Sequence, residues 1–294
     1  MIKNFFKLYP AFQVNIIFFI FLVILVIIFH DKIPLWENFL IIFSSMALFQ
    51  FFLCKQINNS CISFIKNIAF PVFSVLVAFD TVGVITPFIN KDIDLVLLEL
   101  DYMILGFYPY LYFEKIANPL ITELMQLSYC VYYILPFLIG VLLIKEKKWH
   151  EFYKVLFLIL LCYYLSYTGY ILFPALGPRY SIPEIFQSEL RGLFLADYIK
   201  NFLNSLEGIK RDAFPSGHVG ISLLILILIY RYSKKIFWLM FFPVLMLILS
   251  TVYCRYHYFV DILGGILLTI VTLVLGNLYY NFWLTKNENS VYKR

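Results

Sequence analysis

Residues 213–261 read AFPSGHVGISLLILILIYRYSKKIFWLMFFPVLMLILSTVYCRYHYFVD, and this stretch decides how the chain is organised. It contains two apolar runs of about helical span length, joined only by Ser233-Lys234-Lys235. His218 opens the first run, and His257 follows the second. Because two helices with a short connection return the chain to the side on which it started, both histidines are expected at one membrane surface.

The composition indicates an integral membrane protein. Of the 294 residues, 62% are hydrophobic and only 14% are charged, and the mean hydropathy is +0.85. A soluble protein of this size needs more charge to cover its surface. The net charge of +5 is spread over loops without a basic block, so no nucleic-acid partner is expected. The cysteines are odd in number and form no CxxC pair, which indicates packing residues; they are Cys54, Cys61, Cys130, Cys162 and Cys254.

About 20 apolar residues are needed to cross the hydrocarbon core as a helix. We therefore predict an all-α fold, a polytopic transmembrane helix bundle of about eight spans. The candidate spans are 13–29, 36–53, 68–88, 119–144, 151–173, 218–233, 236–254 and 262–284. We expect N-terminal transmembrane helices over 1–60, one catalytic membrane domain over 61–285 and a cytoplasmic tail over 286–294.

Basic residues set the expected orientation in a cell inner membrane or its equivalent. With eight spans both termini lie on one side, and that side carries fourteen of the 23 Lys and Arg residues. Positive charge favours the cytoplasm, so the termini are expected there, with loops 174–217 and 255–261 on the extracytoplasmic face. The other long loop, 89–118, mixes acidic residues with leucines and aromatics and is expected to lie along the interface as an amphipathic helix.

His257 and Asp261 are four residues apart, which places them on one face if a helix begins near His257. An aspartate beside an imidazole fixes the proton on Nδ1 and leaves Nε2 available as a nucleophile or base. The alternative is an interfacial histidine beside an aspartate that caps the helix. The pair alone does not separate these two interpretations.

The string Pro215-Ser216-Gly217-His218 precedes an apolar run and is typical of a helix start. Ser216 can cap the helix, and Gly217 allows a ligand to approach the backbone, where free N–H groups attract an anion. His218 in the first turn can then donate a proton to a leaving oxygen. The alternative is a plain capped helix.

Arg179, in the string Gly177-Pro178-Arg179, and Arg255 both flank apolar spans. A guanidinium group matches the geometry of phosphate oxygens, although arginines also snorkel from spans to the interface. Two histidines, one carboxylate and two arginines at one surface are the groups needed to cut or move a phosphate group.

Together these strings resemble the three signature motifs of the type-2 phosphatidic acid phosphatase superfamily, which includes haloperoxidases. The resemblance covers about residues 95–275, and its P-S-G-H motif is intact. Leu172 stands at the lysine position of the first motif, and Thr251 at the arginine position of the third. The G-P-R string, the H-Y-x-x-D ending and parts of residues 100–136 resemble the branch of the inositol phosphorylceramide synthases.

The resemblance implies a six-helix phosphatase-like catalytic core and a metal-independent reaction through a phosphohistidine. His257 would be the nucleophile, Asp261 would orient it, and His218 would protonate the departing alkoxide. The phosphoryl oxygens would be held by Arg179, Arg255, Ser216 and the Gly217 amide. Water as acceptor gives a phosphatase, whereas a lipid or sugar hydroxyl gives an inositolphosphotransferase-like enzyme. No cofactor is implied, and the expected partner is a membrane lipid.

Other polar residues have two interpretations each. Asp80, inside a span, either makes a structural hydrogen bond or lies near substrate. Asp101 and Glu123 are either solvated or bind an acceptor hydroxyl. Six tyrosines either line a headgroup cleft or form interhelical bonds and interfacial belts; they are Tyr129, Tyr132, Tyr133, Tyr163, Tyr164 and Tyr167.

Two other classes of function compete with an enzyme of phosphate esters. A membrane transporter or channel for a lipid or small polar solute would use polar residues deep in the spans, where only Asp80 is found. A zinc enzyme would use His218, His257 and Asp261 as ligands, but the neighbouring arginines would repel a cation.

Overall fold

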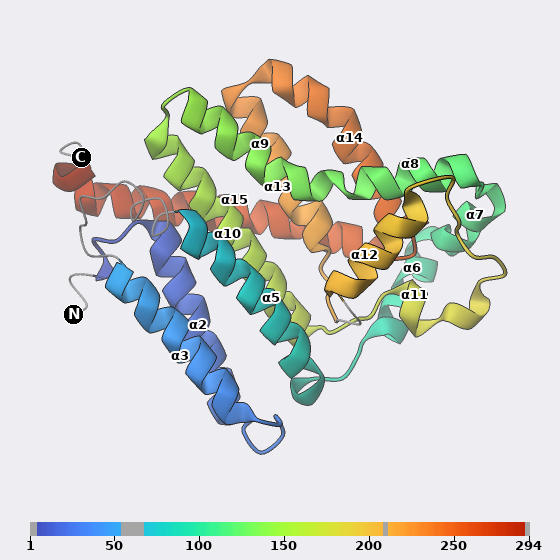
Figure 1. The fold of residues 1–294 in the computed structure, drawn as a ribbon, viewed down its shortest axis with the longest axis horizontal. Helices are drawn as coiled ribbons and strands as arrows, with labels where there is room; N and C mark the ends of the chain where they lie inside the picture. Colours follow the sequence, from blue (N-terminus) through green and yellow to red (C-terminus); the bar gives the residue numbers. More distant parts are fainter. Residues whose placement is uncertain (1–4, 54–67, 208–210, 292–294) are drawn as a thin grey trace.

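The computed structural model describes residues 5–53, 68–207 and 211–291, and within these ranges the chain is helical without a strand (Figure 1). Eight apolar segments coincide with the eight predicted spans, and every end except the last is shifted by three residues or fewer. They are α2 (Pro10–Ile28), α3 (Trp36–Leu53), α5 (Phe70–Ile89), α8 with α9 (Pro119–Tyr129, Val131–Lys145), α10 (Trp149–Leu172), α13 (Gly217–Tyr232), α14 (Lys234–Tyr253) and α15 (Phe259–Val291). The prediction of an all-α polytopic bundle is confirmed.

The eight segments differ in length. Among the described residues, six are long and apolar enough to cross a membrane, whereas α3 and α13 are shorter apolar helices. α13 is short because a serine bounds it at each end: Ser216 caps its start, and Ser233 ends it. The hydroxyl of Ser233 also accepts the N–H of Ile236 at 3.4 Å and so caps α14.

The segment before α8 forms two helices, α6 (Asp94–Leu105) and α7 (Pro109–Ile116), in place of the single amphipathic helix that we expected. Gly106 ends α6 in the left-handed conformation, with φ of +74°, and Pro109 starts α7. The two helices are bent by 76° with respect to each other. α6 packs against α15 and α7 against α14, so the pair covers the ends of the two helices that flank His257.

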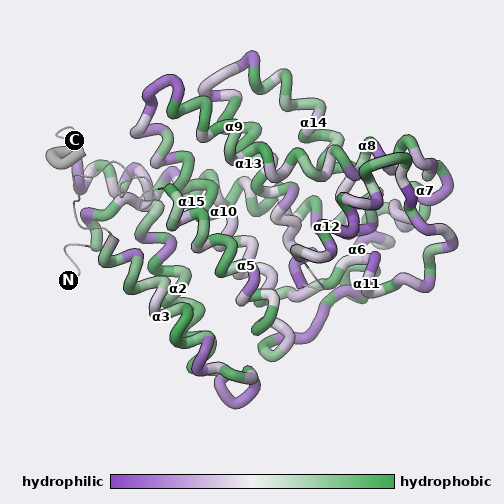
Figure 2. Tube along the Cα trace, viewed as in Figure 1, coloured by the Kyte–Doolittle hydropathy of each residue, from purple (hydrophilic) through white to green (hydrophobic). Residues whose placement is uncertain are grey.

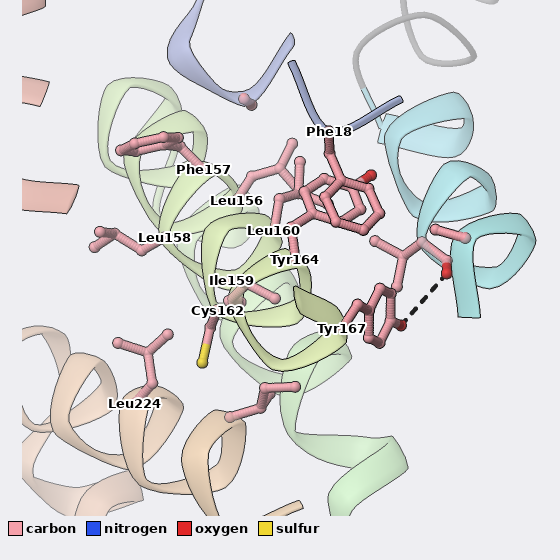
Figure 3. Close-up of a cluster of buried hydrophobic side chains, with 14 of the residues drawn as sticks. Phe18, Leu156, Phe157, Leu158, Ile159, Leu160, Cys162, Tyr164, Tyr167 and Leu224 are labelled. Atoms are coloured by element: carbon pink, nitrogen blue, oxygen red, sulfur yellow. Dashed lines mark hydrogen bonds between the residues drawn. The ribbon is translucent and has the colours of Figure 1, made fainter. Parts of the chain in front are cut away.

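α10 is the central helix of the bundle and packs against α2, α5, α9, α13 and α15. Its sequence is apolar nearly all round, which is typical of a helix enclosed by others. Figure 3 shows Phe18 of α2 stacked on Tyr164, with Leu224 of α13 on the opposite side of α10. The trace in Figure 2 is hydrophobic along the helices and hydrophilic in most of the connections between them.

A buried polar cluster, called here the bundle cluster, joins four helices. Asn15 of α2 donates from Nδ2 to Oε1 of Gln50 in α3 at 2.8 Å and to Oγ of Ser74 in α5 at 3.0 Å. The hydroxyl of Tyr164 in α10 donates to Oδ1 of Asn15. The first two helices are therefore bonded to the rest of the bundle.

The remaining elements lie in the long connection between α10 and α13. They are α11 (Pro178–Ser181), a 3-10 turn (Pro183–Ile185) and α12 (Ala196–Glu207). Cys130, Cys162 and Cys254 are free thiols, while Cys54 and Cys61 lie outside the described residues. The expected domain border near residue 60 also lies outside them, and the expected tail begins as a helical continuation of α15.

Candidate active site

His257 lies in the turn that follows α14. The carbonyl oxygen of Thr251 accepts the N–H groups of Tyr256 and His257 at 3.0 Å each, which folds this turn back on the helix end. The His257 side chain is buried, and its Nδ1 lies 2.8 Å from the carbonyl oxygen of Ala213 and 3.2 Å from Oδ2 of Asp261. Two acceptors beside Nδ1 place the proton there, so Nε2 carries the lone pair.

Asp261 is fully buried in the first turn of α15. Its Oδ2 also accepts the N–H of Tyr258 at 2.8 Å, and its backbone carbonyl accepts the N–H of Ser216 at 3.1 Å. Within the described residues, Oδ1 of Asp261 is buried and has no hydrogen-bond partner. Asp261 therefore orients His257 and ties the start of α15 to the start of α13.

The start of α13 faces Nε2 of His257. Oγ of Ser216 lies 3.3 Å from that nitrogen and also accepts the N–H of Val219 at 3.3 Å as the helix cap. A Cβ on Gly217 would lie 2.5 Å from the hydroxyl oxygen of Tyr170, so a side chain does not fit here. The start of α13 thus lies beside His257, where the positive end of the helix dipole favours an anion.

His218 stands on the Nε2 side of His257. Nδ1 of His218 lies 3.5 Å from Nε2 of His257 and 3.3 Å from the hydroxyl of Tyr129. The rings of Tyr129 and Tyr132 pack against the His218 ring at centroid distances of 4.4 and 4.3 Å. Within the described part of the chain, Nε2 of His218 is buried without a partner. His257, Asp261, Ser216 and His218 form what is called the histidine cluster below.

The histidine cluster is not arranged as a set of metal ligands. Asp261 contacts Nδ1 of His257, whereas His218 contacts Nε2, so the three side chains do not converge on one point. In the part of the chain that the structure describes, no group of three or more His, Cys, Asp or Glu side chains is placed to hold a metal ion.

Arg179 is positioned by the loop that follows α10. Asp94 of α6 accepts the N–H groups of Leu176 and Gly177 at 2.9 to 3.1 Å. Gly177 has φ of +83°, and a Cβ there would lie 2.2 Å from the carbonyl oxygen of Tyr256. Only glycine therefore permits the close contact between this loop and the His257 turn.

The Arg179 guanidinium lies beside the histidine cluster. It covers the ring of Tyr256 at 4.2 Å from the centroid, and Nη1 donates to Oδ1 of Asn204 in α12 at 3.0 Å. The Tyr256 ring is 4.7 Å from the Tyr129 ring, which packs on His218. One aromatic layer thus connects Arg179 with the two imidazoles.

The backbone carbonyl of Arg255 accepts the N–H of Arg179 at 2.9 Å, but its side chain bonds to other elements. It has φ of +63°, and its guanidinium donates to Oε1 of Glu114 and to the carbonyl oxygen of Ser188, each at 3.0 Å. The guanidinium carbon also lies 3.9 Å from the ring centroid of Phe186. These contacts join Arg255 to α7 and to the loop after α11, and its role as a phosphate ligand stays a prediction.

The Arg255–Glu114 pair is charged at neutral pH. Burial lowers the pKa of the Arg255 guanidinium, while the Glu114 charge and hydrogen bond oppose that change. Burial also opposes ionisation of Glu114, but hydrogen bonds from Ser188 and Gln187, together with the Arg255 charge, outweigh it and lower the pKa of its carboxyl. Glu114 therefore stays ionised to a lower pH than an ordinary glutamate.

Thr251 and Leu172, which stand where the resembling motifs have an arginine and a lysine, lie in different parts of the structure. Thr251 is buried in the last turn of α14, where its hydroxyl donates to the carbonyl oxygen of Ile248 at 2.7 Å. Leu172 is the last residue of α10 and is exposed. Neither position brings a cation to the site.

A cavity of about 380 Å³ adjoins the histidine cluster through Arg179 and Tyr256, which line it. Its walls come from α8, α12 and the loop after α11, and many of its lining side chains are polar. They include Thr122, Gln126, Ser188, Asp197, Lys200 and Asn204. The cavity can hold a polar group next to a phosphoryl group bound at Arg179.

Buried carboxylates hold the backbone around the site in place, a role that the sequence analysis did not give to Asp101 or Glu123. Asp101 of α6 is fully buried and accepts the N–H groups of Phe259 and Val260 at 3.0 and 2.8 Å, at the start of α15. Asp94, Leu97 and Asp101 share one face of α6 by their spacing of three and four residues. The spacing of Asp94 and Asp101 around the buried Leu97 is the sequence feature that could have predicted that both carboxylates face the protein interior.

Glu123 of α8 has a similar role. It accepts four successive N–H groups, from Leu193 to Ala196, at 2.8 to 3.2 Å. The interpretation of Asp101 and Glu123 as solvated residues is wrong, because their oxygens are buried and bind backbone N–H groups, while a contact with an acceptor hydroxyl stays a prediction. Both carboxylates satisfy helix-start N–H groups that would otherwise lack partners.

The tyrosines divide between the two interpretations. Tyr129 and Tyr132 line the His218 side of the site, whereas Tyr164 bonds within the bundle cluster and Tyr167 donates to the carbonyl oxygen of Val75 at 3.4 Å. The Tyr163 ring packs against Tyr132 and Tyr167, and Tyr133 is exposed. Asp80 lies in the middle of α5 on its exposed side and is not part of the histidine cluster.

Comparison with known proteins gives the family. A PA-phosphatase related-family protein of Dictyostelium discoideum is 25% identical over 186 residues, covering 56% of this chain and 34% of that protein. The chain thus spans about a third of the length of this relative. No solved structure matches. The sequence model of the PAP2 superfamily matches residues 103–275, more than half of the chain, including the whole histidine cluster and both arginines. The chain belongs to the PAP2 superfamily.

Proposed function

We propose that this chain is an integral membrane enzyme that cuts or moves a phosphate group of a phosphorylated lipid through a phosphohistidine intermediate. The histidine cluster carries the proposal, because Asp261 and Ala213 hold Nδ1 of His257 while Nε2 faces Ser216 and His218. Membership of the PAP2 superfamily supports an enzyme that acts on phosphate esters. The apolar helices support a substrate in the bilayer.

In the first half of the reaction, Nε2 of His257 attacks phosphorus. An N–P bond forms, the P–O bond to the leaving group breaks, and His218 gives a proton to the departing oxygen. Nε2 of His218 suits this role because it has no partner among the described residues. Charge on the equatorial oxygens would be stabilised by Arg179, by the Ser216 hydroxyl and by the Gly217 amide.

In the second half, His218 takes a proton from the acceptor, whose oxygen attacks phosphorus as the N–P bond breaks. Water gives a lipid phosphatase acting on a monoester or diphosphate, and an alcohol gives transfer of a phospho-headgroup. The polar cavity beside Arg179 offers room for an alcohol acceptor of the kind that inositol phosphorylceramide synthases use. Arg255 would join the site by exchanging Glu114 for a phosphoryl oxygen.

We also propose that the reaction needs no metal ion and that the site lies on the extracytoplasmic face. The orientation is supported by the excess of Lys and Arg on the side of the termini. The histidine cluster brings the starts of α13 and α15 next to the end of α14. This arrangement requires that α13 and α14 cross the bilayer in opposite directions, so that the chain returns to the same face. Full turnover by purified enzyme in EDTA is the expected result for the metal-independent mechanism.

The deciding experiment compares the membrane lipids of cells that express the wild type or His257→Ala. A phosphate lost only with the wild type indicates hydrolysis, and a new headgroup indicates transfer. His30→Ala is the matched control, because His30 is also paired with an aspartate, Asp31, but is exposed beyond the end of α2. Equal lipid changes with His257→Ala and the wild type would refute the proposed role of His257.

A further inference from the structure

A group of large apolar side chains is exposed around the start of α12. Leu193, Phe194 and Leu195 precede the helix, Tyr198 and Phe202 lie on it, and each is between 49% and 76% exposed. We propose that this edge of α12 inserts into the lipid bilayer surface, so that α12 is the membrane-docked wall of the cavity beside Arg179. The proposal depends on the bilayer location of the chain, and its link to catalysis depends on the proposed function.

The sequence of α12 has the pattern of an interfacial helix. Its apolar side chains form one sector, but the protein covers only part of that sector: Ile199 and Leu203 face inward, whereas Tyr198 and Phe202 are exposed. The polar sector contains Asp197, Lys200 and Asn204, which line the cavity. A helix with an uncovered apolar edge and a polar opposite face is typical of helices that lie in a membrane interface.

The position of α12 along the bundle favours a bilayer as the partner. Glu123 binds the N–H groups that lead into α12, and it lies four residues, or about 6 Å, from the start of the apolar helix Pro119–Lys145. The same helix exposes Leu120, Leu124 and Leu127. The exposed edge of α12 therefore begins at the level of a span end, where aromatic side chains favour the interface.

The inner face of α12 connects this edge to the candidate active site. Asn204 accepts a hydrogen bond from Arg179 at 3.0 Å, and Lys200 pairs with Glu189 at 3.1 Å on the cavity wall. Docking of Tyr198 and Phe202 into lipid would hold the α12 wall of this cavity at the bilayer surface, next to lipid-borne phosphate esters. The enzyme would then act better on phosphate esters presented in a bilayer than on soluble esters.

The first test places a tryptophan on each edge of the helix in the full chain, reconstituted in phosphatidylcholine vesicles. Phe202→Trp carries the probe on the apolar edge, and Asn201→Trp, about 100° away, is the matched control on the polar edge. Relative to the parent chain, we expect lipid brominated near the headgroup to quench the added emission of Phe202→Trp and not that of Asn201→Trp. Equal quenching of both, or quenching of neither, overturns the proposal.

The second test separates docking from catalysis. Tyr198→Ser with Phe202→Ser should raise KM for phosphatidic acid in vesicles by about tenfold or more while p-nitrophenyl phosphate turnover stays unchanged. A matching loss with both substrates, or a change in oligomeric state with unchanged vesicle KM, overturns the proposal. If the wild type turns over neither ester while Phe202→Trp is quenched, the proposed function fails and the docked helix stands.

Discussion

The bundle cluster and the histidine cluster are both buried, polar and assembled from several helices, yet their hydrogen bonding differs. In the bundle cluster, Asn15 bonds to Gln50, Ser74 and Tyr164, and each bond joins one helix to another. In the histidine cluster, Nε2 of His218 and Oδ1 of Asp261 have no partner among the described residues. Because a buried polar group without a partner costs free energy, these two atoms leave the histidine cluster with hydrogen-bonding capacity that a bound ligand can use.

His257→Ala should have the largest effect on activity of the variants considered, because it removes the central residue of the histidine cluster. Removing the proposed nucleophile should lower turnover by roughly 10⁴-fold or more, because no other described side chain takes its place beside Ser216. The variant should still unfold cooperatively in detergent, since the bundle cluster is intact, with a midpoint lowered by the loss of the His257 bonds to Ala213 and Asp261. Acid-labile ³²P on the wild type, absent from His257→Ala, is the second measurement, and label on both proteins would contradict the assignment.

His218→Gln should have the next largest effect. Loss of the proposed general acid should lower turnover of an alkyl phosphate by about 10² to 10⁴-fold. A p-nitrophenyl ester should be affected less, because its leaving group needs no proton. An equal loss for both esters would assign His218 to binding rather than to proton transfer.

Asn15→Leu tests the bundle cluster, which we expect to support stability and not activity. It removes three hydrogen bonds to side chains on three other helices and should lower the free energy of unfolding by about 1 kcal/mol, with kcat unchanged. The measurements are the thermal midpoint in detergent and kcat. A fall in kcat at an unchanged midpoint would show that the bundle cluster takes part in function.

Glu114→Gln should have the smallest effect, and that effect depends on pH. The folded-state pKa of Glu114 lies below its ordinary value, so its pairing with Arg255 stabilises the protein above that ordinary value, about 4, and is lost as the pH falls through the folded pKa. The midpoint of Glu114→Gln should therefore lie below that of the wild type at pH 7, with the gap narrowing in acid. A gap that is independent of pH would show that the carboxylate charge does not matter.

The spans were predictable because apolar run length alone decides where a helix crosses a bilayer. The histidine cluster was also predictable in part, since the spacing of His257 and Asp261 and the helix start at Ser216 are local features. The break at Gly106, which divides α6 from α7, has a local cause as well, but its signal was hidden in a mixed polar and apolar loop.

The backbone-binding carboxylates could not be predicted from local sequence. The partners of Glu123 are backbone N–H groups 70 to 73 residues further along the chain. Every residue except proline carries such a group, so the residue types do not show which ones a carboxylate will bind. Arg255 shows the same limit. Its bond to Glu114, 141 residues away, and its positive φ could not be predicted from its neighbours, and its role as a phosphate ligand stays a prediction.

The two aspartates of α6 have a consequence for biosynthesis. Asp94 holds the loop before Arg179, and Asp101, two turns or about 10 Å along the same helix, holds the chain just after His257. Their partners follow 82 to 83 and 158 to 159 residues later. The ribosome thus synthesises the helix that spaces the Arg179 and His257 loops before it has made either loop, so both loops take their positions from a segment made earlier.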